Sequence, residues 1–164
     1  MRTIVNSILR LAQFFLVLIA TALLGNVRAN SAHAAAAINF SIFVCALAWV
    51  AVLYGLASNF ISAVAMPIVS LALDGLSTLF TFIGAVVLSA KLTTVNCAHP
   101  GSRSPGWIAY GSDNTQKRCR EIQAGLVFVW FLFATFAATL FLTFKEFRRG
   151  GGSVGRPSMS QIGV

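Results

Sequence analysis

The chain has 164 residues, of which 57% are hydrophobic and 10% are charged, and its formal net charge is +8 at pH 7. Four long apolar runs leave too few polar residues to cover a soluble fold of this length, which excludes an ordinary soluble globular domain. Each run is near the roughly 20 residues that a helix needs to cross a hydrocarbon core of about 30 Å. We therefore predict an all-α, integral membrane four-helix bundle.

The first apolar run lies near residues 8–27 and follows basic residues, as a cleavable signal peptide would. An Ala-x-Ala pattern at residues 32–34 resembles a cleavage site. However, Arg10 and Gln13 interrupt the apolar stretch. We therefore expect a first helix that is retained in the membrane.

The second and third runs, near residues 34–57 and 67–90, are separated by the short polar break "SNFISAVAM", and Pro67 suits the start of a helix. The third run contains Asp74, the one formally charged residue between Ala29 and Ala90. A charge at bilayer depth is costly and usually faces the interior of the bundle or a water-filled cavity. Asp74 therefore needs a partner on another helix.

We predict that Asp74 belongs to an intramembrane polar cluster with Arg10, Gln13 and Tyr54. If both termini are cytosolic, a rise of about 1.5 Å per residue places Asp74 roughly 10 Å beyond the inner end of its helix. Arg10 then lies at the inner boundary, Gln13 lies about one turn deeper, and Tyr54 lies near the same level. Asp74 either pairs with Arg10 or is protonated and hydrogen-bonded by Gln13 or Tyr54. A packing clamp is the favoured role, ahead of a lipid-headgroup or proton-linked one.

A long loop, residues 91–121, is rich in Gly, Pro, Ser and Asn and should form turns on the extracellular side. Cys97 and Cys119 both fall in this interval, and we expect a disulfide between them in an oxidising compartment. A metal site with His99 would lack a fourth ligand, so no metal is expected. The count of flanking basic residues is equal on the two sides, so it does not determine the orientation. The two cysteines and the acidic residues of the loop favour an extracellular loop and therefore cytosolic termini.

The fourth run, near residues 123–144, leads into a basic patch of Lys145, Arg148 and Arg149. We expect this patch to bind anionic lipid of the inner leaflet. Residues 148–164 follow as a basic cytosolic tail, whose Gly and Ser content predicts flexibility. The basic residues form neither a folded basic face nor a stacking platform, so no nucleic-acid partner is expected.

Catalytic and cofactor-binding residues are not expected, because the chain has no metalloprotease motif, no phosphate-binding Gly loop and no nucleophile–base set at a suitable depth. A carrier is also disfavoured, since the sequence shows neither an inverted repeat nor a helix broken at its midpoint. Enzyme and transporter are therefore the less favoured classes.

A family resemblance rests on the order of several stretches, among them "ILRLAQFFLVLIATALLG", "INFSIFVCALAWVAVLYGLAS", "LALDGLSTLFTFIGAVVLSAKL" and "KRCREIQAGLVFVWF". Together they resemble the fungal tetraspan proteins of the MARVEL superfamily, and specifically the non-classical export protein group associated with eisosomes. The resemblance extends from about Ile8 to Phe144.

The resemblance implies a MARVEL-like membrane domain over residues 1–147, with both termini cytosolic. It also implies a multi-pass, non-enzymatic organiser of eisosome-associated plasma-membrane domains, which contain sterol and respond to sphingolipid level. The implied partners are sphingolipid, sterol and anionic inner-leaflet lipid, a further copy of the chain and, indirectly, the eisosome coat proteins. MARVEL-type vesicle trafficking or export is the alternative, with a small transporter behind it.

Overall fold

The computed structural model describes residues 2–31, 35–61, 66–99 and 101–149. Within these ranges it contains four α-helices and no strand: α1 (Arg2–Ala29), α2 (Ala36–Phe60), α3 (Pro67–Leu92) and α4 (Thr115–Arg149). All four helices are long and apolar enough to cross a membrane. The all-α, four-helix membrane architecture is therefore confirmed.

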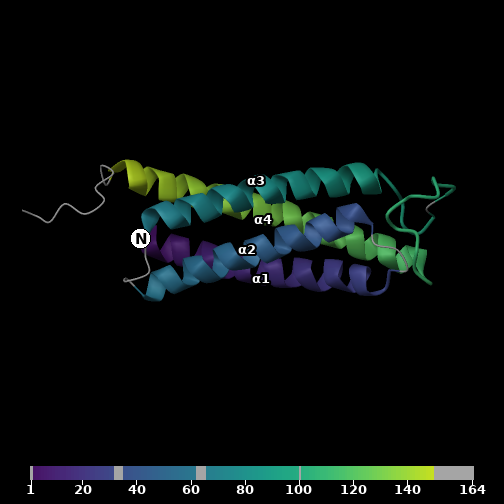
Figure 1. The fold of residues 1–164 in the computed structure, drawn as a ribbon, viewed down its shortest axis with the longest axis horizontal. Coiled ribbons are helices and arrows are strands. Elements are labelled where there is room, and N and C mark those ends of the chain that lie inside the picture. The colour runs from purple at the N-terminus through teal and green to yellow at the C-terminus, as the bar shows by residue number, and fades with distance from the viewer. Residues whose placement is uncertain (1, 32–34, 62–65, 100, 150–164) are drawn as a thin grey trace, which may run out of the picture.

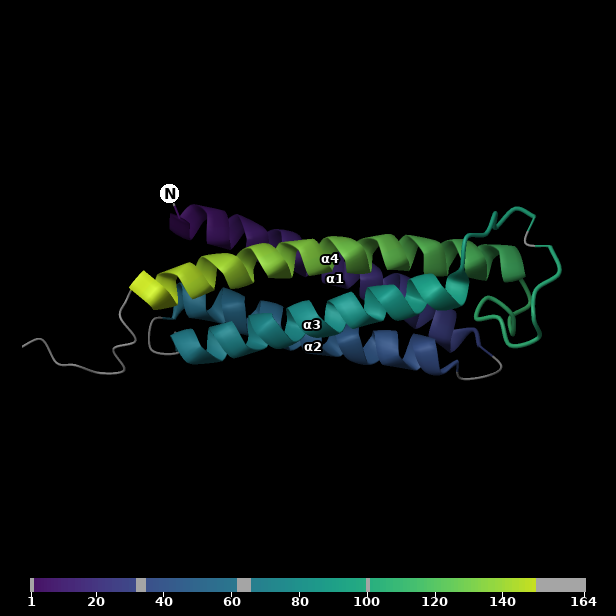
Figure 2. The same ribbon diagram turned by 90° about the horizontal axis from the view of Figure 1, so that it is seen from above.

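The helices run alternately in opposite directions and form one elongated bundle (Figures 1 and 2). Each helix packs against two neighbours in the order α1, α2, α3, α4 and back to α1. The backbones of the diagonal pairs, α1 with α3 and α2 with α4, do not approach one another in the described residues. We call the end where α1 begins and α4 ends the terminal end, and the opposite end the loop end.

The interior of the loop-end half is filled mainly by aliphatic side chains. Its hydroxyl groups, those of Ser41 and Thr81, donate to carbonyl groups of their own helices. Small residues allow close packing here: a Cβ atom at Gly84 would lie 3.3 Å from the Val44 side chain. The main side chains of this core are Val17, Ala20, Leu24 and Val27 of α1, Ile38, Val44 and Ala48 of α2, Ala85, Leu88 and Leu92 of α3, and Ile122, Val129 and Leu132 of α4.

Helix α4 begins at Thr115, whereas the sequence analysis expected a helix only from residue 123. The Asn114 side chain accepts a hydrogen bond from the Lys117 backbone N–H at 2.9 Å, which satisfies a free donor of the first turn. The placement of Cys119 in the loop was therefore wrong, because Cys119 lies on this added part of the helix. The connecting loop is residues 93–114 rather than 91–121, and we call it the loop cap.

The other end of α4 also extends beyond the expected boundary. It continues to Arg149, so Arg148 and Arg149 belong to the helix and not to the tail that was expected from residue 148. In "FKEFRR" each Phe is followed by two charged residues, so this last part of the helix is more polar than the apolar run before it. The rest of the expected tail, residues 150–164, lies outside the described residues.

Candidate functional site

An ion pair between α1 and α3 crosses the interior of the bundle in the half nearer the terminal end. Arg10 donates from Nη1 to Asp74 Oδ1 at 2.7 Å and from Nη2 to Asp74 Oδ2 at 2.6 Å. Arg10 is 2% exposed and Asp74 is 1% exposed, so both charges are removed from solvent and lipid. Two parallel bonds of this kind fix orientation as well as distance. The pair therefore joins the two helices that the packing order leaves diagonally opposite.

Gln13 extends this network to the fourth helix. Its Oε1 atom accepts a hydrogen bond from Arg10 Nη1 at 3.2 Å, and its Nε2 donates to Thr139 Oγ1 on α4 at 3.2 Å. Thr139 in turn donates to the Phe136 carbonyl at 3.0 Å. Gln13 and Thr139 are both 0% exposed. The sequence analysis had not identified Thr139, since a threonine in an apolar helix has no distinguishing pattern.

Helix α2 contributes Gly55, whose lack of a side chain leaves space for Arg10. A Cβ atom at this position would lie 2.4 Å from Arg10 Nε and 2.6 Å from Arg10 Cζ. Real Cβ atoms are not found so close to other heavy atoms, so the guanidinium occupies the space that a larger residue would take. We call Arg10, Gln13, Gly55, Asp74 and Thr139 the cross-bundle cluster, in which all four helices take part.

Tyr54, which the sequence analysis placed in the cluster, lies elsewhere. Its hydroxyl accepts a hydrogen bond from the Met66 backbone N–H at 3.3 Å, beside the connection between α2 and α3. Tyr54 has the expected depth, but the next residue, Gly55, faces the bundle interior in its place. Successive helical residues are about 100° apart, so depth alone did not identify the interior face.

The cluster has a structural character rather than a reactive one. Charges in a water-poor interior are stable only when paired, and removing one partner of such a pair is strongly destabilising. Within the described ranges no three His, Cys, Asp or Glu residues are grouped as a metal site. Four buried side-chain polar atoms of the described residues have no hydrogen-bond partner, and two of them are Arg10 Nε, within the cluster, and Ser77 Oγ, one turn from Asp74 on α3. The arrangement therefore fixes helix register at some cost in unsatisfied polar groups.

A second buried cation, Arg118, lies at the loop end. Its Nε donates to the Ile108 carbonyl at 3.0 Å, and its Nη1 donates to the Val27 carbonyl at 3.2 Å and to Ser31 Oγ. Arg118 thus connects α4 to the loop cap and to the end of α1. The sequence analysis gave Arg118 no specific role, because it placed residues 91–121 in a loop.

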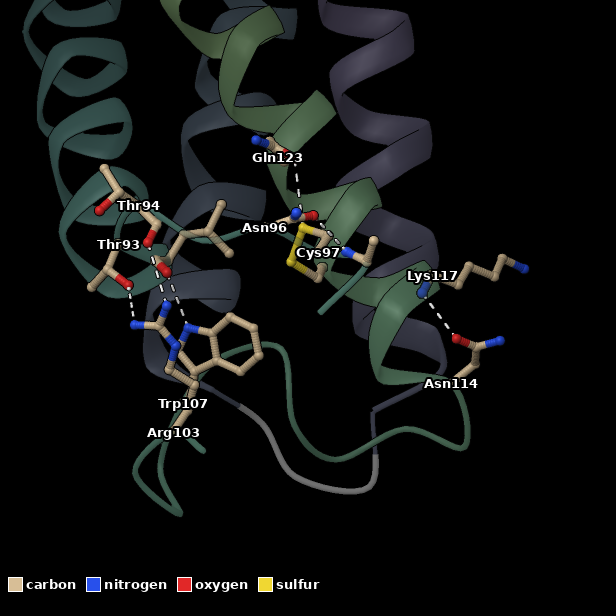
Figure 3. Close-up of a disulfide and its surroundings, with 12 residues drawn as sticks. Thr93, Thr94, Asn96, Cys97, Arg103, Trp107, Asn114, Lys117 and Gln123 are labelled. Carbon is tan, nitrogen blue, oxygen red and sulfur yellow. Dashed lines mark hydrogen bonds between the residues drawn. A yellow bond between two sulfur atoms is a disulfide. The ribbon is translucent and has the colours of Figure 1, made fainter. Parts of the chain in front are cut away.

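The loop cap is attached to the bundle by a disulfide and by an aromatic anchor (Figure 3). The structure joins Cys97 in the cap to Cys119 on α4, with their Cα atoms 5.6 Å apart. Trp107 is buried and its Nε1 donates to the Leu92 carbonyl at 3.0 Å. Arg103 lies 5.8 Å from the centre of the Trp107 ring and donates to Thr93 Oγ1 at 3.2 Å. The loop cap is therefore packed against the loop end of the bundle and attached to both α3 and α4.

The basic patch of Lys145, Arg148 and Arg149 lies on the last turns of α4 at the terminal end, and all three side chains are exposed. The Lys145 ammonium lies 5.4 Å from the centre of the Phe141 ring, and the Arg148 guanidinium lies 5.8 Å from that of Phe144. Cations at such distances are attracted to aromatic faces. Two of the three charges are therefore positioned by rings of the same helix.

Comparison with known proteins places this architecture in a family. Residues 3–142 match the MARVEL family, described as a membrane-associating domain. The chain is 30% identical to Non-classical export protein 2 of Saccharomyces cerevisiae over 99% of its own length and 100% of the relative's. It is 25% identical to Non-classical export protein 2 homolog 1 of the same yeast, over 77% of this chain and 71% of that protein. No solved structure matches the chain significantly. The four apolar helices, their alternating directions and the match over nearly all of them show that the chain belongs to the MARVEL family.

Proposed function

We propose that the protein is a non-enzymatic organiser of the plasma membrane, which helps to form or maintain sterol-containing eisosome domains and responds to sphingolipid level. Its family is one of membrane domains and is not a known enzyme family. The similarity to Non-classical export protein 2 over the full length of both chains supports a membrane-associated function.

The observation that carries this proposal is the contrast between a closed interior and an extensive apolar exterior. The interior is filled by the aliphatic core and by the cross-bundle cluster. Outside, large apolar side chains are exposed on all four helices, as is expected for surfaces solvated by lipid. Examples are Phe15 at 53%, Phe43 at 52%, Leu79 at 52%, Phe131 at 55% and Phe141 at 61% exposure. A protein of this form acts through the lipid and protein that surround it.

The proposed orientation has both termini in the cytosol. The Cys97–Cys119 disulfide belongs in an oxidising compartment, which suits an extracellular loop end. The basic patch of Lys145, Arg148 and Arg149 then lies at the inner leaflet, whose anionic lipids attract such residues. Mass mapping of protein alkylated in intact cells tests this orientation. Free thiols at both Cys97 and Cys119 would contradict it.

Two measurements test the function itself. The fluorescently tagged chain, expressed in a fungal cell that lacks its own relative, should concentrate in furrow-like plasma-membrane domains and redistribute when sphingolipid synthesis is blocked. Gently purified protein should carry sterol and sphingolipid above their proportion in the surrounding membrane, as measured by mass spectrometry. A uniform distribution that sphingolipid depletion leaves unchanged would overturn the proposal.

A vesicle-trafficking or export role is the second candidate, and it is favoured by the similarity to a protein named Non-classical export protein 2. In that case the tagged chain should move on vesicles, and its deletion should lower secretion of a reporter that lacks a signal peptide while the membrane domains remain intact. Transport is less favoured, because the polar cluster ends where the aliphatic core of the loop-end half begins. Liposomes containing the protein should show no solute flux above empty liposomes.

A further inference from the structure

A groove opens between α3 and α4 near the terminal end of the bundle. It has a volume of about 460 Å³, and its lining is entirely apolar: Leu71 from α3, with Ala137, Leu140, Phe141 and Phe144 from α4. The groove is open along its length to the surroundings of the bundle and does not enclose a ligand. Its depth matches the half of the membrane nearer the terminal end, because Leu71 lies one turn inside α3. Such a groove suits a hydrocarbon chain.

Two cations lie at the terminal-end margin of this groove. Lys145 is positioned against Phe141 and Arg148 against Phe144, so the rings that line the groove are the same rings that hold the charges. Within the described residues the ion pairs are Arg10 with Asp74 and Lys117 with Glu121, so neither Lys145 nor Arg148 is neutralised by a carboxylate. The groove therefore combines an apolar floor with a positive rim.

We propose that this groove binds one anionic phospholipid of the leaflet at the terminal end, with an acyl chain against Leu71, Leu140 and Phe144 and the headgroup phosphate at Lys145 and Arg148. The proposal rests on the orientation given under the proposed function, since it takes the terminal end to face the anionic cytosolic leaflet. A neutral lipid or a second protein copy would leave the two rim cations unpaired, which is why charge favours an anionic lipid. The groove thus supplies a defined site where the basic patch alone would give diffuse attraction.

The rim charges provide the first test. The full-length protein is purified in mild detergent with phosphatidylserine or with phosphatidylcholine, and retained lipid is counted by native mass spectrometry. We expect one phosphatidylserine per chain. Each basic residue near a lipid surface contributes about a five-fold factor in affinity, so Lys145→Gln with Arg148→Gln should weaken retention by about 30-fold. Arg149→Gln removes the same charge from the same turn without a groove-lining ring beneath it, and should have a much smaller effect.

The apolar floor provides the second test. Ala137→Phe fills the groove from its lining, whereas Ala138→Phe adds the same ring at the exposed neighbouring position and serves as the matched control. We expect phosphatidylserine retention to fall by about ten-fold or more in Ala137→Phe and to stay at the parental level in Ala138→Phe. Thermal unfolding of both variants verifies that the fold is intact.

Three results would overturn the proposal. Equal losses from Lys145→Gln, Arg148→Gln and Arg149→Gln would indicate diffuse electrostatic attraction. Unchanged retention in Ala137→Phe would show that lipid does not occupy the groove. A lipid-free dimer in native mass spectra would make a second copy the occupant. These outcomes are separate from failure of the proposed function, which is read from the distribution of the parent chain in cells and is independent of phosphatidylserine retention in detergent.

Discussion

The terminal half and the loop-end half of the bundle hold the same four helices together by different means. In the terminal half, the cross-bundle cluster links diagonal helices by the Arg10–Asp74 ion pair. In the loop-end half, aliphatic side chains fill the interior and a disulfide attaches the loop cap to α4. The difference shows that a membrane bundle can be held by an ion pair between diagonal helices at one end and by a covalently attached cap at the other.

The physical reason lies in the solvent. Lipid tails are as apolar as Leu side chains, so burial of the aliphatic core supplies no hydrophobic driving force between helices. The loop-end half therefore relies on dispersion contacts, on close approach at Gly84 and Gly125, on the cap, and on the hydrogen bonds of Arg118. The terminal half has few covalent constraints beyond the chain itself, and its charged hydrogen bonds specify one arrangement. The contribution of each half to stability can be tested by removing the ion pair from the terminal half and the disulfide from the loop-end half.

The largest effect is expected in the terminal half, from Asp74→Leu. This change leaves Arg10 as a buried, unpaired cation, and we expect a loss of about 3–5 kcal/mol in stability. Asp74→Asn should lose less, because the amide keeps one hydrogen-bond acceptor, and adding Arg10→Gln should recover part of that loss. The measurement is unfolding in mild detergent. Leu79→Ala, on the lipid-facing side of the same helix, is the control, and parental stability of Asp74→Leu would contradict the role of the cluster.

In the loop-end half, the combined change Cys97→Ser and Cys119→Ser should cost about 3 kcal/mol, because the disulfide closes a loop with a sequence separation of 22. Hydrogen exchange should rise in the loop cap and at the start of α4, while the cross-bundle cluster stays protected. Reductant should reproduce this loss in the parent and change nothing in the double variant. A reductant effect on the variant would show that another process is being measured.

Gly55→Ala tests the terminal half by adding one methyl group. The new Cβ would meet the Arg10 guanidinium at 2.4 Å, and we expect overpacking to cost about 1–3 kcal/mol. Gly25→Ala is the matched control, because its Cβ would have no atom within 4 Å and alanine favours helix by up to about 1 kcal/mol. Unfolding midpoints of the two variants should therefore move in opposite directions. If Gly55→Ala is as stable as Gly25→Ala, Arg10 has room to move and the cluster is looser than described.

The smallest effect is expected from Trp107→Phe in the loop cap. The ring contact with Arg103 is largely retained, but the hydrogen bond to the Leu92 carbonyl is lost, at a cost of about 1 kcal/mol. Hydrogen exchange at the end of α3 should report the change. Trp130→Phe, on the partly exposed surface of α4, should leave that exchange unaltered. An equal response to both changes would mean that the cap is not anchored through Trp107.

The sequence could predict depth in this fold but not rotation about each helix axis. Helix direction and rise per residue placed Arg10, Gln13, Tyr54 and Asp74 in or at the border of the inner half of the membrane, and the structure brings Arg10, Gln13 and Asp74 together. Tyr54 was placed wrongly because α2 is apolar on every side, so no amphipathic pattern marks its interior face. For the same reason the sequence did not indicate that Gly55 faces the interior, where its lack of a side chain makes room for Arg10.

The polar start of α4 was the other part that the sequence could not supply. Residues 115–122 were assigned to the loop because residues 91–121 as a whole are rich in Gly, Pro, Ser and Asn, and because the apolar run begins only near residue 123. Only in three dimensions does Arg118 turn inward to the Val27 and Ile108 carbonyls. Its backbone acceptors lie on distant segments, and no local spacing rule could have identified them.

The ion pair between α1 and α3 has a consequence for how the protein is made. Arg10 precedes Asp74 by 64 residues, so the ribosome delivers α1, and then α2, to the membrane before the carboxylate exists. During that interval Arg10, close to the beginning of its helix, can extend its guanidinium to the nearby headgroups. It enters the hydrocarbon with a partner only when α3 arrives. The ion pair is therefore completed by the third helix, before α4 adds Thr139, and a nascent chain that stops after α2 should expose Arg10 to water-soluble reagents.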